Sequence, residues 1–176
     1  SMVLGRACIA ANLQVRQSEI HGMAQRGGSV HSHFRIADQT ICSDMIPYSK
    51  ADMILAMEPM EALRYLPWLS PQGRIITNTE PVVNIPDYPK IETIYNELDH
   101  YPNVLLVNAT EIVRKANAAR AVNMALLGAA SAFLPLEERV LQDAIRAHFE
   151  GKKASLAEKN LGIFAEARES AQGSAR

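Results

Sequence analysis

Cysteine is scarce in this sequence, which has only Cys8 and Cys42 among its 176 residues. The two lie far apart, and neither belongs to a Cys-x-x-Cys pair. An iron–sulfur cluster needs a set of thiolate ligands, and a structural zinc site needs cysteines or histidines at short spacing, so this chain alone can assemble neither. Two free thiols fit a reducing environment, and we expect a cytoplasmic protein.

Charge of one sign and long apolar runs are lacking too. The formal net charge is −1, and the 18 basic residues are scattered, which predicts neither a nucleic-acid partner nor an anionic membrane surface. The most apolar run, residues 121–134, contains Asn123 and Ser131 and is shorter than the ~20 residues of a membrane span. Residues 1–12 lack the basic start and the small-residue cleavage site of a signal peptide. We therefore expect no membrane partner.

Short apolar strands alternate with helices along the chain. With 48% hydrophobic residues, the chain can bury one full core, so we expect a single domain over residues 1–176. Strands are predicted near residues 14–19, 30–36, 52–57, 74–78 and 104–107, with a short return strand over 40–43. Helices are predicted over 2–11, 60–69, 91–98 and most of the last third. This order predicts a three-layer, Rossmann-like α/β fold with a mostly parallel sheet and a helical C-terminal third.

A polar loop with three glycines separates the first two predicted strands. Gly22, Gly27 and Gly28 allow positive φ and let several N–H groups meet at one point beside Arg26. Chemistry is often displayed on such loops, so an anion or ligand seat is predicted. A tight turn without a ligand is the alternative, because a glycine-plus-basic pattern is weak by itself.

Four residues outside the loop are further candidates, each with a structural alternative. Glu58 follows a buried strand, where α/β sheets place ligand contacts, but it could equally cap the next helix. His33 and Arg35 alternate with the predicted core positions of their strand, and they either touch a ligand or pair with local carboxylates. Asn123 lies inside an apolar helix and is expected to bond a loop carbonyl.

A family resemblance adds to this interpretation. Residues 21–30 (HGMAQRGGSV), with 32–35 (SHFR), resemble the signature of the gamma subunit or domain of 2-oxoacid:ferredoxin oxidoreductases. The Gly-Met-x-Gln-Arg-Gly-Gly form is similar to that of the beta subunit of indolepyruvate ferredoxin oxidoreductase. Residues 51–67 (ADMILAMEPMEALRYLP) resemble the strand, turn and helix of the same subunit, and 78–79 and 123–129 also fit. The resemblance therefore spans nearly the whole chain.

The start of the sequence departs from the family pattern. Family members begin with an apolar strand and a glycine-rich turn ahead of the first helix, whereas this sequence begins inside that helix. The resemblance therefore implies a fold like domain III of pyruvate–ferredoxin oxidoreductase, with the first strand missing from the sheet.

The resemblance implies a non-thiamine-binding subunit of an enzyme that oxidatively decarboxylates an aryl-2-oxoacid such as indolepyruvate to an acyl-CoA. The sequence has no Gly-Asp-Gly followed by Asn-Asn to hold thiamine diphosphate through magnesium. Thiamine diphosphate, Mg and the iron–sulfur clusters are therefore expected in a partner subunit, with CoA and ferredoxin serving the complex. We expect this chain alone to be inactive and to bind no cofactor or metal.

The resemblance implies that this chain completes a site at the subunit interface and supplies no catalytic residue of its own. A stand-alone α/β module, which binds a small molecule or is purely structural, is the alternative. The residues expected at the interface with substrate or cofactor are Met23, Gln25, Arg26, Gly27, Gly28, Ser32, His33, Arg35 and Glu58.

Overall fold

The computed structural model describes residues 1–21, 30–151 and 154–174, in which helices and strands alternate as predicted. The first half of the chain forms α1 (Met2–Ala10), β1 (Gln14–His21), β2 (Val30–Ala37), β3 (Ala51–Ala56), α2 (Pro59–Arg64), the short helix η1 (Leu66–Trp68) and β4 (Leu69–Asn78). The second half forms α3 (Ile91–Leu98), β5 (Val104–Val107), α4 (Ala109–Lys115), η2 (Ala119–Ala121), α5 (Val122–Ser131), α6 (Glu138–Phe149) and α7 (Ala154–Ser174).

The strands form two sheets instead of the single sheet that the sequence predicted. β3, β4 and β5 are parallel, in that order, whereas β1 and β2 form an antiparallel hairpin whose register runs from Gln14 opposite Ala37 to His21 opposite Val30. The return strand expected over 40–43 is absent, because residues 38–50 form an irregular connection between β2 and β3. The polar, alternating strands pair with each other, and the apolar strands form the sheet that helices cover on both faces.

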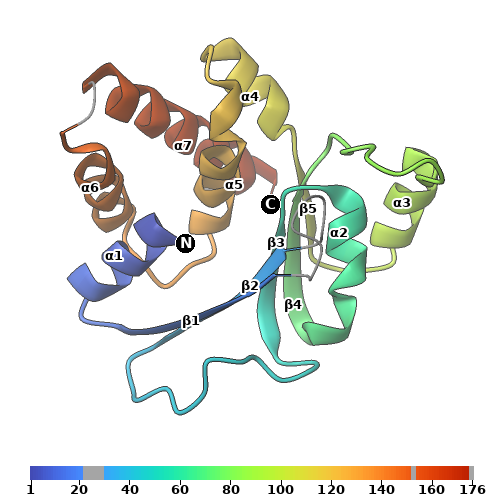
Figure 1. The fold of residues 1–176 in the computed structure, drawn as a ribbon, viewed down its shortest axis with the longest axis horizontal. Coiled ribbons are helices and arrows are strands. Elements are labelled where there is room, and N and C mark those ends of the chain that lie inside the picture. Colours follow the sequence, from blue (N-terminus) through green and yellow to red (C-terminus); the bar gives the residue numbers. More distant parts are fainter. Residues whose placement is uncertain (22–29, 152–153, 175–176) are drawn as a thin grey trace.

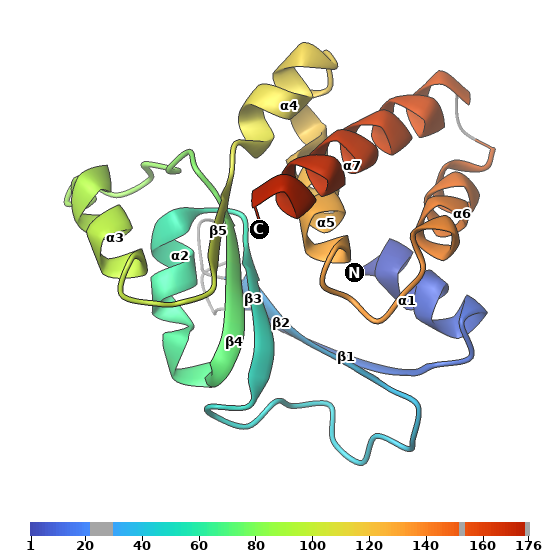
Figure 2. The ribbon, with the colours of Figure 1, turned by 180° about the vertical axis from the view of Figure 1, so that it is seen from behind.

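Helices cover the three-stranded sheet in the three-layer arrangement that was predicted. Figure 1 shows α2 and α3 on one side of the sheet and α5 and α7 on the other, and Figure 2 gives the opposite view. Neighbouring residues of the central strand serve different layers: Ile75 packs with α2 and α3, and Ile76 packs with the larger helical cluster. Both are fully buried, as expected for a strand covered on both faces.

The C-terminal helices pack at very short range. A Cβ on Gly128 of α5 would lie 2.3 Å from the carbonyl oxygen of Phe164 in α7, so only glycine fits at this position. Arg168 of α7 donates to Ser131 Oγ at 2.8 Å and to Glu138 Oε2 at 3.1 Å, which joins α5, α6 and α7. Within the described ranges, none of the helices combines the length and the apolar character that a membrane crossing requires.

The final helix begins ahead of the cap that its sequence pattern indicates. Ser155 and Glu158 have the spacing of a capping box, but α7 already includes Ala154, so Ser155 lies inside the helix. Gly151 ends the preceding helical region with φ of +78°, a conformation that glycine adopts without strain.

Candidate functional site

An open groove of about 1500 Å³ lies beside β3. On one edge β3 pairs with β4, and none of the described strands pairs with its other edge. The walls of the groove come from the start of α1, from β2, from β3 and the start of α2, and from η2 and α5. Three of the predicted site residues, Ser32, His33 and Glu58, line it, so the fold brings them to one surface.

Five predicted site residues, Met23, Gln25, Arg26, Gly27 and Gly28, lie outside the described residues, and their roles stay predictions. The strands on either side of this loop can be placed. β1 and β2 remain paired up to His21 and Val30, and Val30 lines the groove. The described residue that follows this segment, Val30, therefore lies at the groove.

Glu58 acts as the cap of α2, which was the structural alternative. Its Oε2 accepts a hydrogen bond from the backbone N–H of Glu61 at 2.9 Å, and Pro59 occupies the first turn of the helix. Its Oε1 accepts from the Tyr88 hydroxyl. Burial, followed by the hydrogen bond to Glu58, raises the pKa of the Tyr88 phenol above its ordinary value. Each carboxylate oxygen thus has a donor from this chain.

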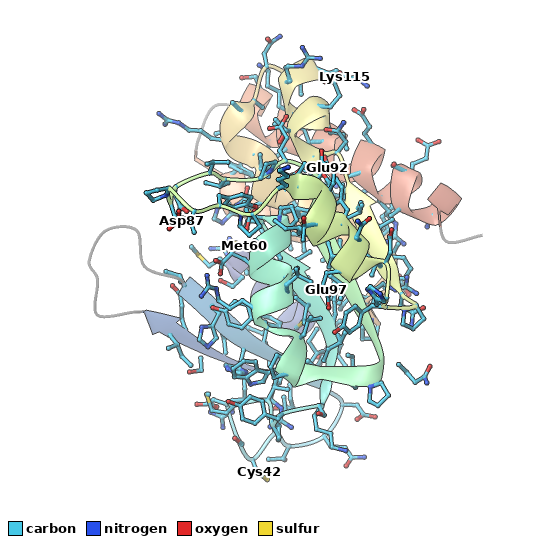
Figure 3. The ribbon with its side chains drawn as sticks, turned by 90° about the vertical axis from the view of Figure 1, so that its right-hand side faces the viewer. Cys42, Met60, Asp87, Glu92, Glu97 and Lys115 are labelled. Atoms are coloured by element: carbon cyan, nitrogen blue, oxygen red, sulfur yellow. The ribbon has the colours of Figure 1, made fainter. Side chains whose placement is uncertain are left out.

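The Glu58–Tyr88 contact joins the start of α2 to the loop that follows β4. Figure 3 shows Met60, in the first turn of α2, and Asp87, next to Tyr88 in the sequence, at similar heights between Cys42 at the bottom of the view and Lys115 at the top. Glu58 follows the end of β3, and Tyr88 lies in the loop that follows the end of β4. The contact therefore belongs to the carboxyl-terminal end of the parallel strands, where α/β sheets place ligands.

His33 and Arg35 hold the 38–50 connection through its backbone, and not through carboxylates as the alternative had it. Arg35 Nη1 donates to the carbonyl of Ser43 at 2.8 Å and to that of Met45 at 3.3 Å. His33 Nδ1 accepts from the backbone N–H of Ile46 at 3.2 Å. Among the predicted site residues that the structure describes, Arg35 alone does not line the groove.

The faces of β2 are partly reversed from the prediction. His33 was expected to alternate with the core positions of its strand, which places its neighbour Ser32 at a core position, but Ser32 is exposed and His33 is only 5% exposed. The 38–50 connection folds over the face that carries His33, as the hydrogen bond to Ile46 shows. Local alternation could not reveal this cover, because it comes from another part of the chain. Ser32 thereby offers an exposed hydroxyl at the groove.

Aromatic rings surround His33, and sequence reasoning missed this arrangement. The histidine–aromatic cluster consists of His31, His33, Tyr48, Tyr65 and Trp68. His31 lies 5.5 Å from His33 and 4.8 Å from Tyr65 between ring centroids, and Trp68 lies 6.1 Å from both histidines. The Tyr65 hydroxyl and His31 Nδ1 are hydrogen-bonded at 3.2 Å, and Tyr48 packs 4.6 Å from Trp68. The two-residue spacing of the histidines placed them on one strand face, but their aromatic neighbours are tertiary contacts.

Asn123 differs from its prediction. It is exposed at the start of α5 and lines the groove near Asn117 and Arg120, so it is not the buried amide that was expected to need a loop carbonyl. The adjacent end of α5 has no side-chain cap. The groove therefore has a polar end with a cationic side chain as well as an apolar wall.

The apolar wall of the groove carries exposed aliphatic side chains. Val30, Leu55, Met57 and Val82 all line the groove, with 57, 45, 50 and 57% of their surface exposed. Aliphatic residues that gather on one exposed face of a protein typically mark a surface that binds a partner. Over the residues the structure describes, no group of three or more His, Cys, Asp or Glu side chains is arranged to hold a metal ion.

Comparison with known proteins links this fold to one enzyme family. The family model described as pyruvate ferredoxin/flavodoxin oxidoreductase matches residues 1–170. Indolepyruvate oxidoreductase subunit IorB of Archaeoglobus fulgidus is 36% identical over 170 residues, which is 92% of this chain and 82% of that protein. The subunit of the same name from Methanothermobacter thermautotrophicus is 38% identical over 173 residues, 93% of this chain and 86% of that protein.

Solved structures agree on the fold. The gamma subunit of keto/oxoacid ferredoxin oxidoreductase from Geobacter sulfurreducens superimposes with a TM-score of 0.70 at 19% identity, covering 97% of this chain and 88% of that one. The 2-oxoglutarate:ferredoxin oxidoreductase from Magnetococcus marinus, with 2-oxoglutarate, coenzyme A and succinyl-CoA bound, gives a TM-score of 0.72 at 16% identity. There the match covers 97% of this chain but only 28% of the other, so one region of that longer chain has this fold.

Proposed function

Because this chain belongs to the pyruvate ferredoxin/flavodoxin oxidoreductase family, we propose that it is the non-thiamine-binding subunit of an indolepyruvate ferredoxin oxidoreductase. The complex would oxidatively decarboxylate an aryl-2-oxoacid to an acyl-CoA and pass the electrons to ferredoxin. This chain would have no turnover alone. Its role would be to complete a site that it shares with a larger partner subunit.

The observation that carries the proposal is the position of the groove. Ser32, His33 and Glu58 line it together with Val30, the first described residue after the polar loop, and exposed aliphatic residues form one of its walls. A surface that combines polar candidates with uncovered apolar side chains suits a site that closes when a partner docks. Docking would also exclude water from the reacting groups.

The cofactors are assigned to the partner by the chemistry of their ligands. Two cysteines cannot supply the four thiolates of an iron–sulfur cluster, and the motif that holds thiamine diphosphate through magnesium is missing from the sequence. Thiamine diphosphate, when bound in the complex, supplies the carbanion chemistry of the decarboxylation. This chain would contribute hydrogen-bond donors and an apolar cover.

Arg26 is the residue we propose for contact with an anionic group of the substrate, of thiamine diphosphate or of CoA. Its guanidinium offers a planar pair of donors that lysine cannot reproduce, and Gly27 and Gly28 allow a backbone approach that a Cβ would block. Ser32, at the exposed edge of β2, would add a hydroxyl to the same surface. Glu58 and Arg35 would act indirectly, by fixing α2 and the 38–50 connection.

The proposal is tested by reconstitution with the thiamine-bearing partner and an assay of 2-oxoacid-dependent viologen reduction. Neither chain alone should turn over, and the mixture should. Losing a desolvated charge-assisted contact costs ~2–5 kcal/mol, so Arg26→Ala should lower kcat/KM of the complex about tenfold or more. Arg26→Lys should recover little of this loss, since lysine lacks the planar fork. The melting temperature of the isolated chain should stay nearly unchanged.

Arg139→Ala is the matched control, because Arg139 lies on α6 with an 88% exposed side chain and pairs only loosely with Asp143. It should leave both activity and stability as they are. Turnover by this chain alone would refute the subunit role. Full activity of the Arg26→Ala complex, or a loss of several kcal/mol in the isolated variant, would make Arg26 a structural residue and the loop a simple turn.

A further inference from the structure

We propose that the hydrogen bond between His33 and Ile46, called the clasp below, is sensitive to protonation. It holds the 38–50 connection and one end of the groove in place only while the His33 imidazole is neutral. The inference does not depend on the proposed function, because it rests on contacts within this chain. Its starting point is a histidine that is buried, that receives a backbone hydrogen bond, and that has no carboxylate partner among the described residues.

The hydrogen bond from Ile46 fixes the protonation state of His33. A backbone N–H only donates, so His33 Nδ1 must carry a lone pair to accept from Ile46 at 3.2 Å. The neutral ring therefore has its proton on Nε2. That atom is buried and has no hydrogen-bond partner among the described residues. The ring centroids of His31 and Trp68 lie 5.5 and 6.1 Å from that of His33, and the face of such a ring receives an N–H only weakly.

A second proton on His33 has no favourable place. It would sit on Nδ1 and point at the N–H of Ile46, which replaces a hydrogen bond by a contact between two donors. The resulting charge would be buried beside His31, which can itself become cationic, with its centroid 5.5 Å away. Burial, and then the charge of His31, lower the pKa of His33 from its usual 6.5. The elements packed against His33 carry the following titratable and charged groups: Arg16 and Glu19 on β1, His31 and Arg35 on β2, Asp38, Cys42, Asp44, Tyr48 and Lys50 on the 38–50 connection, and Tyr65 next to η1.

The sign of the pH dependence follows from this lowered pKa. The unfolded chain takes up the proton of this histidine near pH 6.5, and the folded chain takes it up only at lower pH. The stability that neutral His33 contributes is therefore fully present above pH 6.5 and is lost as the pH falls from there through the folded pKa. The contact that weakens first is the one that involves the titrating atom, the hydrogen bond to Ile46.

The clasp controls the groove because its parts line one end of it. His31, His33, Ile46, Tyr65 and Trp68 all belong to the lining. Ile46 is held by its hydrogen bond to His33. The same connection carries Tyr48, whose ring centroid lies 4.6 Å from that of Trp68. Release of Ile46 would loosen the middle of the connection, with Arg35 still holding Ser43 and Met45 and the Ser49 N–H still donating to the Pro67 carbonyl at 2.9 Å. The groove would then lose a defined wall without unfolding of the helical layers.

The experiment uses the full chain and two signals in the clasp. Trp68 is the single tryptophan of the sequence, so its fluorescence reports on the cluster alone. Amide exchange at Ile46 reports on the hydrogen bond itself. On stepwise acidification from pH 7.5 through and below pH 6.5, we expect quenching of Trp68 and loss of Ile46 protection beyond the intrinsic change in exchange rate, at a pH where the amides of α5 still keep theirs.

Three variants distinguish the contributions of His33 and His31 to this pH response from that of a histidine elsewhere in the chain. His33→Asn keeps an acceptor near the position of Nδ1 but cannot be protonated, so Ile46 should stay protected throughout. His31→Asn should keep the release of Ile46 and move it to higher pH, because the repelling charge is gone. His100→Asn, an exposed site far from the cluster, should behave as the unmodified chain.

Nitrogen-15 NMR of the unmodified protein gives a check that needs no substitution. At pH 7.5, His33 should show a bare Nδ1 and a protonated Nε2. A protonated Nδ1, or protection of Ile46 that is lost on acidification only together with that of the α5 amides, would overturn the proposal. So would a pH-dependent release of Ile46 that persists unchanged in His33→Asn.

Discussion

The contact between α5 and α7 and the wall of the groove along β3 differ in how far their apolar residues are covered. Where the two helices meet, Phe164 has no exposed surface, and Gly128 touches its carbonyl so closely that no other side chain fits. Along β3, Leu55 and Met57 leave about half of their surface exposed. The apolar residues at the helical contact are covered by this chain itself, whereas those of the groove wall are only partly covered.

This difference in coverage indicates that the helical contact stabilises the fold and that the groove wall serves binding. Apolar area that is removed from water stabilises the fold by about 25 cal/mol per Å², and exposed aliphatic residues contribute little of this. The helical contact therefore supplies stability to the isolated chain. Part of the apolar surface of the groove wall stays exposed to solvent, so a partner that binds there can bury it.

The largest effect is expected from Phe164→Ala, at the centre of the covered region. Removal of a fully buried phenylalanine side chain is expected to lower the free energy of unfolding by about 3–5 kcal/mol. Urea denaturation of the variant and of the unmodified chain measures this loss. Leu156→Ala on the same helix is the control, because this residue is already 40% exposed and should cost far less. Equal losses for the two variants would mean that the α5–α7 contact is not the tightly packed part of the molecule.

A smaller loss is expected when the close approach itself is disturbed. Gly128→Ala places a Cβ 2.3 Å from the Phe164 carbonyl oxygen, and overpacking of this kind costs about 1–3 kcal/mol. Gly162→Ala in α7 is the matched control: no atom lies within 4 Å of its Cβ, so alanine should stabilise the helix by up to about 1 kcal/mol. The comparison fails if both substitutions shift the thermal midpoint in the same direction.

The smallest change in stability is expected at the groove wall, where the effect should appear in binding instead. Leu55→Ser and Leu106→Ser replace partly exposed leucines on strands of one sheet, but only Leu55 lines the groove. Both variants should lose no more than about 1 kcal/mol, because little apolar area is at stake. Leu55→Ser alone should weaken association with the partner subunit, by roughly tenfold in Kd or about 1.4 kcal/mol. Calorimetric titration would show an equal effect of Leu106→Ser if the groove is not the interface.

Local sequence patterns were sufficient for most of the elements. The helix over 91–98 has the predicted bounds, since its apolar residues recur at helical spacing, and the predicted apolar runs form β3 and β5. The helix after β3 is shorter than predicted, ending at Arg64, because Pro67 stands in the 3₁₀ turn that follows. The cap of that helix by Glu58 was one of two interpretations, since an acidic residue before proline is a local signal.

The parts that failed depend on contacts between distant segments. Nothing near Ser32 and His33 in the sequence shows that the 38–50 connection covers one face of their strand. Likewise, β1 and β2 form a hairpin that is separate from the three-stranded sheet. The alternation of polar and apolar residues within a strand does not specify which strand it pairs with. Asn123 was expected to need a buried partner because its neighbours are apolar, but it is exposed and lines the groove.

Hydrogen–deuterium exchange of this chain, alone and bound to the thiamine-bearing partner, tests the central claim most directly. Binding should slow exchange in the segments that carry the groove wall, residues 30–34, 53–57 and 82–85, and should leave α5 and α7 near Gly128 and Phe164 unchanged. Protection confined to α3 and α4, which contribute no residue to the groove, or no protection near the groove in an active complex, would contradict the assignment of the groove as the site that a partner completes.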